Sequence, residues 1–182
     1  KLSFLIQALV KTSRLETGII NVNPRRSSVR ELLANSIKGI SKKAEDKNLA
    51  LQLSCASDLQ ARFDPKWTEE AISNILDNGV KYTPVGGSIS VSVTVYEMFT
   101  RIDIADNGIG IEEPEINQIF KRFYRSPSVN QDEGVGIGLY LTREILSAQG
   151  GYIKVKSTPP KGSIFSIFLP NSPEESAILP NC

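Results

Sequence analysis

Four polar residues recur at helical spacing near the middle of the chain. The segment Asn-Ile-Leu-Asp-Asn-Gly-Val-Lys-Tyr-Thr-Pro (residues 74–84) places Asn74, Asn78, Lys81 and Tyr82 at positions i, i+4, i+7 and i+8, which share one face of an α-helix. Amide oxygens suit Mg²⁺, which is often held together with substrate phosphates, and a lysine adds positive charge for those phosphates. A solvated helix face would show a similar pattern, so this segment alone leaves both interpretations open.

The residues around this segment indicate where its helix starts and which side it buries. Asp64 followed by Pro65 is typical of an N-cap and a first helical position. Ile72, Leu76 and Gly79 fall on the side opposite the polar row, so we expect them to pack into a core and turn the polar row toward a ligand or solvent.

A second candidate segment is Asp106-Asn-Gly108-Ile-Gly110, directly after a predicted strand. The glycines let the backbone bend and let a flat ligand approach closely. Asp106 carries an acceptor-only carboxylate, which can accept the exocyclic N–H of adenine but would be left unpaired by the oxygen of guanine. Asp-Asn-Gly is equally a good turn sequence, so this motif is weak by itself.

Two further segments could contact phosphate. Gly134-Val-Gly136-Ile137-Gly138-Leu139 precedes a predicted helix, and backbone N–H groups at a helix N-terminus can cradle phosphate. Phe120-Lys-Arg122-Phe-Tyr-Arg125 alternates aromatic and basic residues, and arginine binds phosphate in a bidentate manner. Apolar anchors with arginines reaching water would explain the second segment as well. Neither a Rossmann fingerprint nor a P-loop is present.

Composition limits the functions available to the chain. Its 182 residues are 40% hydrophobic and 23% charged, which fits one globular domain with a short appendage. The net charge of +1 gives no reason to expect a nucleic-acid partner. The sequence contains no histidine, which excludes histidine-based catalysis and metal binding within these residues. Cys55 and Cys182 show no disulfide or zinc pattern.

Hydrophobic periodicity predicts an α+β fold, a two-layer sandwich in which helices cover one face of a mixed, mostly antiparallel sheet. Ser28 and Glu31 form a capping-box pattern that starts a helix. The expected helices are residues 1–20, 28–44, 65–82, 114–124 and 138–149; the expected strands are 49–53, 61–64, 88–96, 100–105, 151–157 and 163–169; the expected linker is 21–27, the polar loop 126–133 and the tail 171–182.

In their order and spacing, the four segments resemble the motifs of the catalytic, ATP-binding domain of sensor histidine kinases, within the GHKL family. The N box corresponds to residues 74–84, the first glycine box to 106–110, the F box to 120–125 and the second glycine box to 134–139. The resemblance covers about residues 28–170. Residues 1–20 resemble the second helix of that family's dimerisation and phosphoacceptor hairpin. The first helix, which carries the phosphoacceptor histidine, is missing, and the chain begins in a helical pattern without Met, so we expect it to be a fragment.

The resemblance implies a role for each motif residue. Asn78 would hold Mg²⁺ with help from Asn74, Lys81 would meet phosphate, Tyr82 would flank the nucleotide and Asp106 would select adenine. Asn74, Asn78, Lys81 and Arg122 would form the catalytic set, and the ATP site would also include Gly108, Gly110, Ile111, Arg122, Arg125, Gly134, Gly136, Ile137, Gly138 and Leu139. Val135 departs from the Ser or Thr that the family often has there, and a backbone cradle should tolerate this change.

The implied function is transfer of the γ-phosphoryl group of Mg-ATP to a histidine that this fragment lacks. The implied partners are a phosphoacceptor helix of the same or a partner subunit, a response-regulator receiver domain and a second copy in a homodimer, with the domain cytoplasmic in a membrane-bound sensor. The alternatives are a GHKL-type ATPase, an anti-sigma-factor serine kinase or a nucleotide-free scaffold. Related ATPases place a glutamate base where Asn74 stands, and an amide cannot act as a base.

Overall fold

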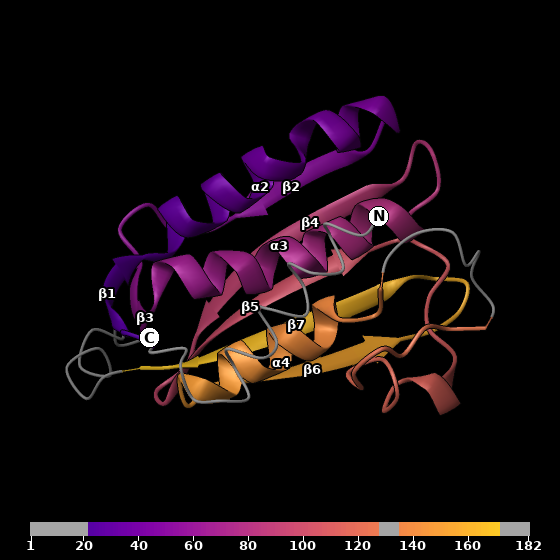
Figure 1. Ribbon diagram of the computed structural model, residues 1–182. Helices are drawn as coiled ribbons and strands as arrows, with labels where there is room; N and C mark the ends of the chain where they lie inside the picture. The colour runs from indigo at the N-terminus through magenta and orange to yellow at the C-terminus, as the bar shows by residue number, and fades with distance from the viewer. Residues whose placement is uncertain (1–21, 128–134, 172–182) are drawn as a thin grey trace.

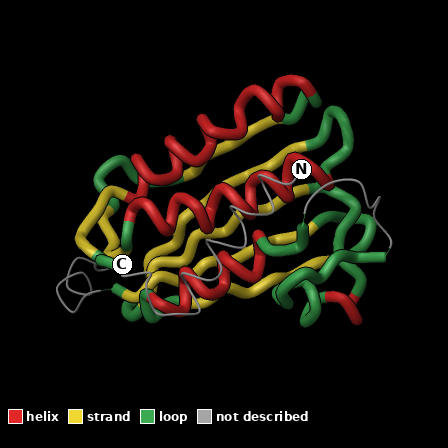
Figure 2. Tube along the Cα trace, viewed as in Figure 1, coloured by secondary structure: helices red, strands yellow, loops and turns green. Residues whose placement is uncertain are grey.

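The computed structural model describes residues 22–127 and 135–171, which form two layers (Figure 1). One layer is a five-stranded sheet. The other consists of the three α-helices of the described residues, which lie on the same face of that sheet (Figure 2). The predicted α+β sandwich is confirmed.

Two of the three described helices begin where their capping residues predict. Helix α2 (Val29–Asp46) follows Ser28, whose Oγ accepts a hydrogen bond from the Glu31 N–H at 3.2 Å. Helix α3 (Pro65–Tyr82) follows Asp64, whose carboxylate accepts from the Trp67 N–H at 3.1 Å. Both contacts satisfy an N–H that has no partner within its own helix. Helix α4 (Gly138–Ala148) has no side-chain cap.

The strands follow the predicted alternation closely. The main sheet has the order β2 (Ala50–Ser54), β4 (Ser88–Val95), β5 (Phe99–Asp106), β7 (Ser163–Pro170) and β6 (Tyr152–Ser157). Strand β2 runs parallel to β4, and the other neighbouring pairs are antiparallel. A two-stranded sheet pairs β1 (Arg25–Ser28) with β3 (Gln60–Phe63).

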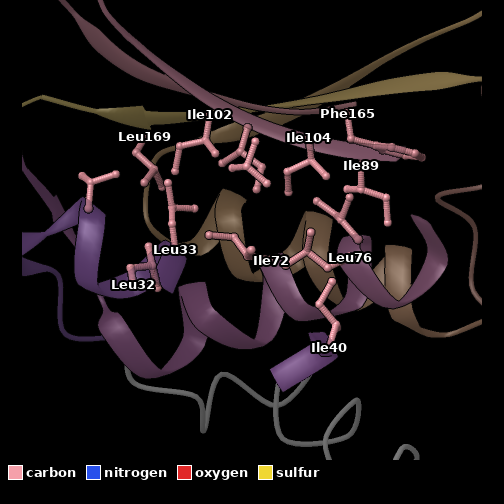
Figure 3. Close-up of a cluster of buried hydrophobic side chains, with 14 of the residues drawn as sticks. Leu32, Leu33, Ile40, Ile72, Leu76, Ile89, Ile102, Ile104, Phe165 and Leu169 are labelled. Atoms are coloured by element: carbon pink, nitrogen blue, oxygen red, sulfur yellow. The ribbon is translucent and has the colours of Figure 1, made fainter. Parts of the chain in front are cut away.

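The hydrophobic core fills the space between the helices and the sheet (Figure 3). Ile72 and Leu76 point from α3 toward Ile89, Ile102 and Ile104, and all five side chains are buried. The side of α3 opposite the polar row is therefore anchored on β4 and β5.

Two expectations are wrong. Residues 25–28, assigned partly to the linker, form strand β1. Residues 114–124 do not form a continuous α-helix: a 3₁₀ turn (Glu113–Glu115) is followed by turns whose hydrogen bonds mostly span three residues. Phe123 donates its N–H to Gly136 O at 2.8 Å. This long-range bond takes the chain out of a helical path, with Phe123 at φ +63°. The expected helix 1–20, most of the polar loop and residues 172–182 lie outside the described residues.

The sheet face away from the helices is mostly polar. Near one end of β6, an edge strand, the Tyr152 and Phe168 rings stack at 4.4 Å between centroids, with the Lys154 ammonium over both. Lys154 and Lys156 alternate along β6, and both are exposed.

Gln149 is a buried polar link between α4 and the start of α3. Its Oε1 accepts the Asp64 N–H at 2.6 Å, and its Nε2 donates to Ile145 O at 3.2 Å and contacts Thr68 Oγ1 at the same distance.

Gln149→Met would keep similar volume but leave buried donors and acceptors without partners, so we expect a loss of about 2–3 kcal/mol in the free energy of unfolding. Urea denaturation measures this, and a loss below about 0.5 kcal/mol would contradict the role assigned to Gln149.

Candidate functional site

A cavity of about 950 Å³ opens beside the polar face of α3. Its walls come from α3, the end of β5 and the turn after it, the segment around Glu115–Ser126, the start of α4 and strand β7. Ligand pockets commonly have volumes of roughly 300–1,000 Å³, so the cavity is large enough for a nucleotide.

Helix α3 supplies the polar row along one wall. Asn74, Asn78, Lys81 and Tyr82 all line the cavity and are all partly buried. The Lys81 ammonium lies 5.0 Å from the centroid of the Tyr82 ring. The predicted shared face is therefore confirmed, and it faces the cavity because Ile72 and Leu76 hold the other side of α3 in the core.

Asn74 has a buried donor that no other described residue satisfies. Its Nδ2 is buried and makes no hydrogen bond within the described part of the chain. Its Oδ1 lies 3.5 Å from the point where a Cβ on Gly138 would stand, so the polar row of α3 meets the second glycine segment here. A buried polar group without a partner requires an explanation, and a bound ligand or water at this point would supply the missing acceptor.

Asp106 ends β5 and also lines the cavity. Its Oδ1 accepts the Gly108 N–H at 2.8 Å. Burial raises the pKa of the Asp106 carboxyl, and hydrogen bonds from the backbone of Gly108 and Ser163 offset part of that rise. The carboxylate is thus held in a fixed direction, with room to accept a further hydrogen bond.

Glycine is required where the turn after β5 touches its neighbours. A Cβ on Gly108 would lie 2.7 Å from Tyr82 O, and Gly110, at φ +77°, would bring a Cβ within 2.9 Å of Pro159 Cα. The Ile109 N–H donates to Tyr82 O at 3.3 Å. The turn therefore packs directly on the C-terminal end of α3, which fixes the distance between Asp106 and the polar row.

The second glycine segment contacts the aromatic–basic segment before it. Gly136 has φ +73°, and a Cβ there would overlap the backbone carbonyl oxygen of Tyr124. The Tyr124 hydroxyl donates to Glu115 Oε1 at 2.9 Å. Burial, followed by this contact with the Glu115 carboxylate, raises the pKa of Tyr124. Arg125 lines the cavity beside them.

Most of the predicted site residues lie together around the cavity. Those that line it are Asn74, Asn78, Lys81, Tyr82, Asp106, Gly110, Ile111, Arg125, Gly136, Ile137, Gly138 and Leu139. Gly108 and Arg122 are not among the lining residues. Gly108 packs against the Tyr82 carbonyl, and the Arg122 guanidinium lies 4.8 Å from the centroid of the Phe123 ring. Gly134 lies outside the described residues.

The structure adds lining residues that the sequence did not indicate. Lys43 and Lys47 reach the cavity from α2 and its C-cap, Asp77 from α3, and Ser163 and Phe165 from β7. Lys43 Nζ and Asp77 Oδ1 form an ion pair at 2.6 Å. Asp77 lies inside the motif at residues 74–84, so its position could have been noticed, whereas no sequence pattern marks Lys43 or Lys47.

The cavity's donors and acceptors fit a magnesium nucleotide. No group of three or more His, Cys, Asp or Glu side chains that could hold a metal occurs among residues 22–127 and 135–171. The amide oxygen of Asn78, which lines the cavity, is of the oxygen-ligand type that Mg²⁺ takes together with phosphate oxygens.

Comparison with known proteins gives the family. The sequence profile described as "Histidine kinase-, DNA gyrase B-, and HSP90-like ATPase" matches residues 63–173, more than half of the chain. The chain belongs to this family. Its match covers the polar row of α3, both glycine segments and β7, which are the parts that build the cavity.

The similar proteins include sensor kinases. The adaptive-response sensory kinase SasA of Synechocystis sp. is 33% identical over 170 residues, which is 91% of this chain and 44% of SasA. The chain thus spans less than half the length of this curated relative. The fold matches full-length ShkA in complex with AMPPNP with a TM-score of 0.83 and 22% identity, covering 94% of this chain and 36% of ShkA. ThkA in complex with the response regulator TrrA gives a TM-score of 0.75 and 18% identity, covering 96% and 50%.

Within the described ranges, no helix combines the length and the apolar character needed to cross a bilayer.

Proposed function

We propose that this chain binds Mg-ATP and transfers the γ-phosphoryl group to a histidine supplied by another segment or another chain, as the catalytic domain of a two-component sensor kinase. The observation that carries this proposal is that the Asp106 carboxylate and the row Asn74, Asn78 and Lys81 line one cavity. In a chain of the histidine kinase-like ATPase family, this arrangement supports a site in which one group selects the base and the others bind phosphate and metal.

Each group has a distinct task in this proposal. Asp106 accepts the exocyclic N–H of adenine, and the Tyr82 ring flanks the nucleotide. Lys81 and Arg125 bind phosphate oxygens, while the amide oxygen of Asn78, with Asn74 beside it, would hold Mg²⁺. The metal would supply charge neutralisation on the phosphates. The chain's own residues act mainly by positioning, since phosphoryl transfer requires little covalent chemistry from the protein.

The residue at position 74 favours a kinase over an ATPase. Water is a poor nucleophile without a general base, and the amide of Asn74 cannot serve as one. A neutral imidazole already carries a free nucleophilic nitrogen, so it needs little activation. Histidine is absent from the sequence, so the acceptor must come from elsewhere. The buried Asn74 Nδ2 has no hydrogen-bond partner among residues 22–127 and 135–171. This disfavours the scaffold alternative, because an unused polar cavity would leave the donor unsatisfied.

The proposed partners follow from this acceptor requirement. They are a phosphoacceptor helix of the same or a partner subunit, a second copy in a homodimer, and a response-regulator receiver domain that takes the phosphoryl group. The complex of ThkA with TrrA supports the last of these. In the proposed parent protein, this domain is the cytoplasmic part of a sensor.

Calorimetric titration tests the proposal. We expect the protein to bind AMPPNP more tightly with Mg²⁺ than with EDTA, and to bind GTP at least about tenfold more weakly than ATP, because guanine leaves Asp106 unpaired. Asp106→Asn should remove this preference. A folded sample that binds neither nucleotide, or binds ATP and GTP equally, would refute the proposal.

The raised pKa of Asp106 predicts a pH dependence of binding. The free protein holds the Asp106 proton to higher pH than an ordinary aspartate does, whereas adenine requires the carboxylate as acceptor. Affinity should therefore fall as pH decreases through the raised pKa and reach a plateau above it. Titrations across acidic to neutral pH measure this profile. Asp106→Asn retains the titration of the nucleotide itself, so an identical profile in this variant would contradict the assignment.

A further inference from the structure

The C-terminal end of α3 is held by a residue of another helix, Lys47. An α-helix leaves its last four carbonyl groups without partners inside the helix. The Lys47 ammonium donates to three carbonyl oxygens here, Val80 O at 2.7 Å, Lys81 O at 3.1 Å and Thr83 O at 2.6 Å. The remaining carbonyl in this run, Tyr82 O, accepts the Ile109 N–H.

Lys47 lines the cavity but has no donor left for a ligand. An ammonium group has three N–H donors, and Lys47 uses all three on the carbonyls at the end of α3. A cation beside the C-terminal carbonyls also interacts favourably with the helix dipole. Its position on the cavity wall therefore does not make it a phosphate ligand.

The backbone of Lys47 strengthens the same connection. Its N–H donates to Ala44 O and Glu45 O at the C-terminal end of α2. Its carbonyl accepts the N–H of Gly86, in the loop that follows α3, at 3.0 Å. Helices α2 and α3 lie side by side (Figure 1). One residue thus ends α2, caps α3 and fixes the loop between α3 and β4.

We propose that Lys47 is a positioning residue of the nucleotide site. It fixes the distance between the Lys81 side chain, which faces the phosphates, and the turn after Asp106, which faces adenine. The last turn of α3 carries Lys81 and Tyr82 into the cavity, and the Tyr82 carbonyl holds the turn through Ile109. Without Lys47, three carbonyls lose their partner and the end of α3 can shift, which moves both halves of the site. This inference rests on the proposed binding of ATP.

The test compares Lys47→Met with the wild type in titrations with ATP and with adenosine. We expect both affinities to fall by about tenfold or more, and in similar proportion, because small displacements of positioning groups have large effects. A direct phosphate contact by Lys47 would weaken ATP alone, and that result would overturn the proposal. So would unchanged affinity for both ligands.

Two controls separate positioning from general loss of stability. Lys38→Met removes an exposed lysine of α2 that lies outside the cavity, and it should bind as the wild type does. Gln149→Met is destabilised at a buried site outside the cavity lining, and it should bind adenosine within about twofold of the wild type below its melting temperature. An equal loss of adenosine affinity in Gln149→Met would overturn the proposal.

A spectroscopic readout completes the experiment. The amide ¹⁵N–¹H resonance of Ile109 should shift in Lys47→Met and stay in place in Gln149→Met, since only the first change disturbs the acceptor of that N–H; an unmoved resonance in Lys47→Met would count against the proposal. If Lys47→Met does not fold, Lys47→Gln, which keeps two N–H donors, is measured in the same way with the same deciding outcomes. A wild type that binds no adenine ligand would overturn both the proposed function and this inference, whereas normal binding by a folded Lys47 variant would overturn the inference alone.

Discussion

Asn78→Ala should abolish the magnesium dependence of nucleotide binding while leaving the fold intact. The Asn78 side chain is only partly buried and makes no hydrogen bond within the described residues, so its removal should change the free energy of unfolding by less than about 0.5 kcal/mol. Its amide oxygen is the proposed metal ligand. Affinity for AMPPNP in the presence of Mg²⁺ should fall by at least about tenfold, since a lost ligand to a charged centre costs upward of 1.5 kcal/mol.

The control for this variant is the same substitution at an amide elsewhere. Asn35→Ala changes an exposed residue of α2 that lies away from the cavity, and it should bind Mg-AMPPNP as the wild type does. With EDTA, Asn78→Ala and the wild type should have equal affinities. A folded Asn78→Ala protein that still gains affinity on adding Mg²⁺ would show that the metal is held by other groups.

Gly162→Ala should destabilise the whole domain. Gly162 precedes β7 with φ +96°, and a Cβ there would overlap Asp106 O and lie 2.8 Å from Asn107 Cα. The positive φ alone costs about 1 kcal/mol for a residue with a side chain. Because both contacts involve backbone at the end of β5, the neighbours cannot rotate away, and we expect a total loss above about 3 kcal/mol in the free energy of unfolding.

A second glycine separates the steric effect from the conformational one. Gly86 has a similar φ of +79°, but a Cβ there would have no atom within 4 Å. Gly86→Ala should therefore lose only about 1 kcal/mol. Thermal or urea denaturation of the two variants measures the difference. Equal losses in both would mean that the close packing of Gly162 on the end of β5 contributes nothing.

The sequence predicted the parts of the fold and site whose determinants are local. Ser28 and Asp64 mark helix starts because their side chains accept N–H groups only three residues away. The polar row of α3 could be assigned to one face because helical geometry fixes which residues share it. Alternating residues in β4 and β5 likewise fixed the buried side of the sheet.

The parts that could not be predicted depend on contacts between distant segments. The helix expected at residues 114–124 does not form, and near its end Phe123 donates its N–H to Gly136, a partner that no local pattern reports. Lys47 looks like an ordinary lysine at a helix end, and only the packing of α2 against α3 brings it to three carbonyls. Arg122 and Arg125 lie in the same aromatic–basic segment and could not be told apart from the sequence, yet only Arg125 lines the cavity.

The charges on edge strand β6 have a consequence for the domain in concentrated solution. An edge strand offers unpaired backbone groups to any other strand that approaches it, which is a common route to aggregation. The exposed Lys154 and Lys156 occupy alternate positions along β6. A second copy adding its own β6 edge to edge would bring four ammonium groups together, so growth of the sheet by strand addition is electrostatically opposed on this side.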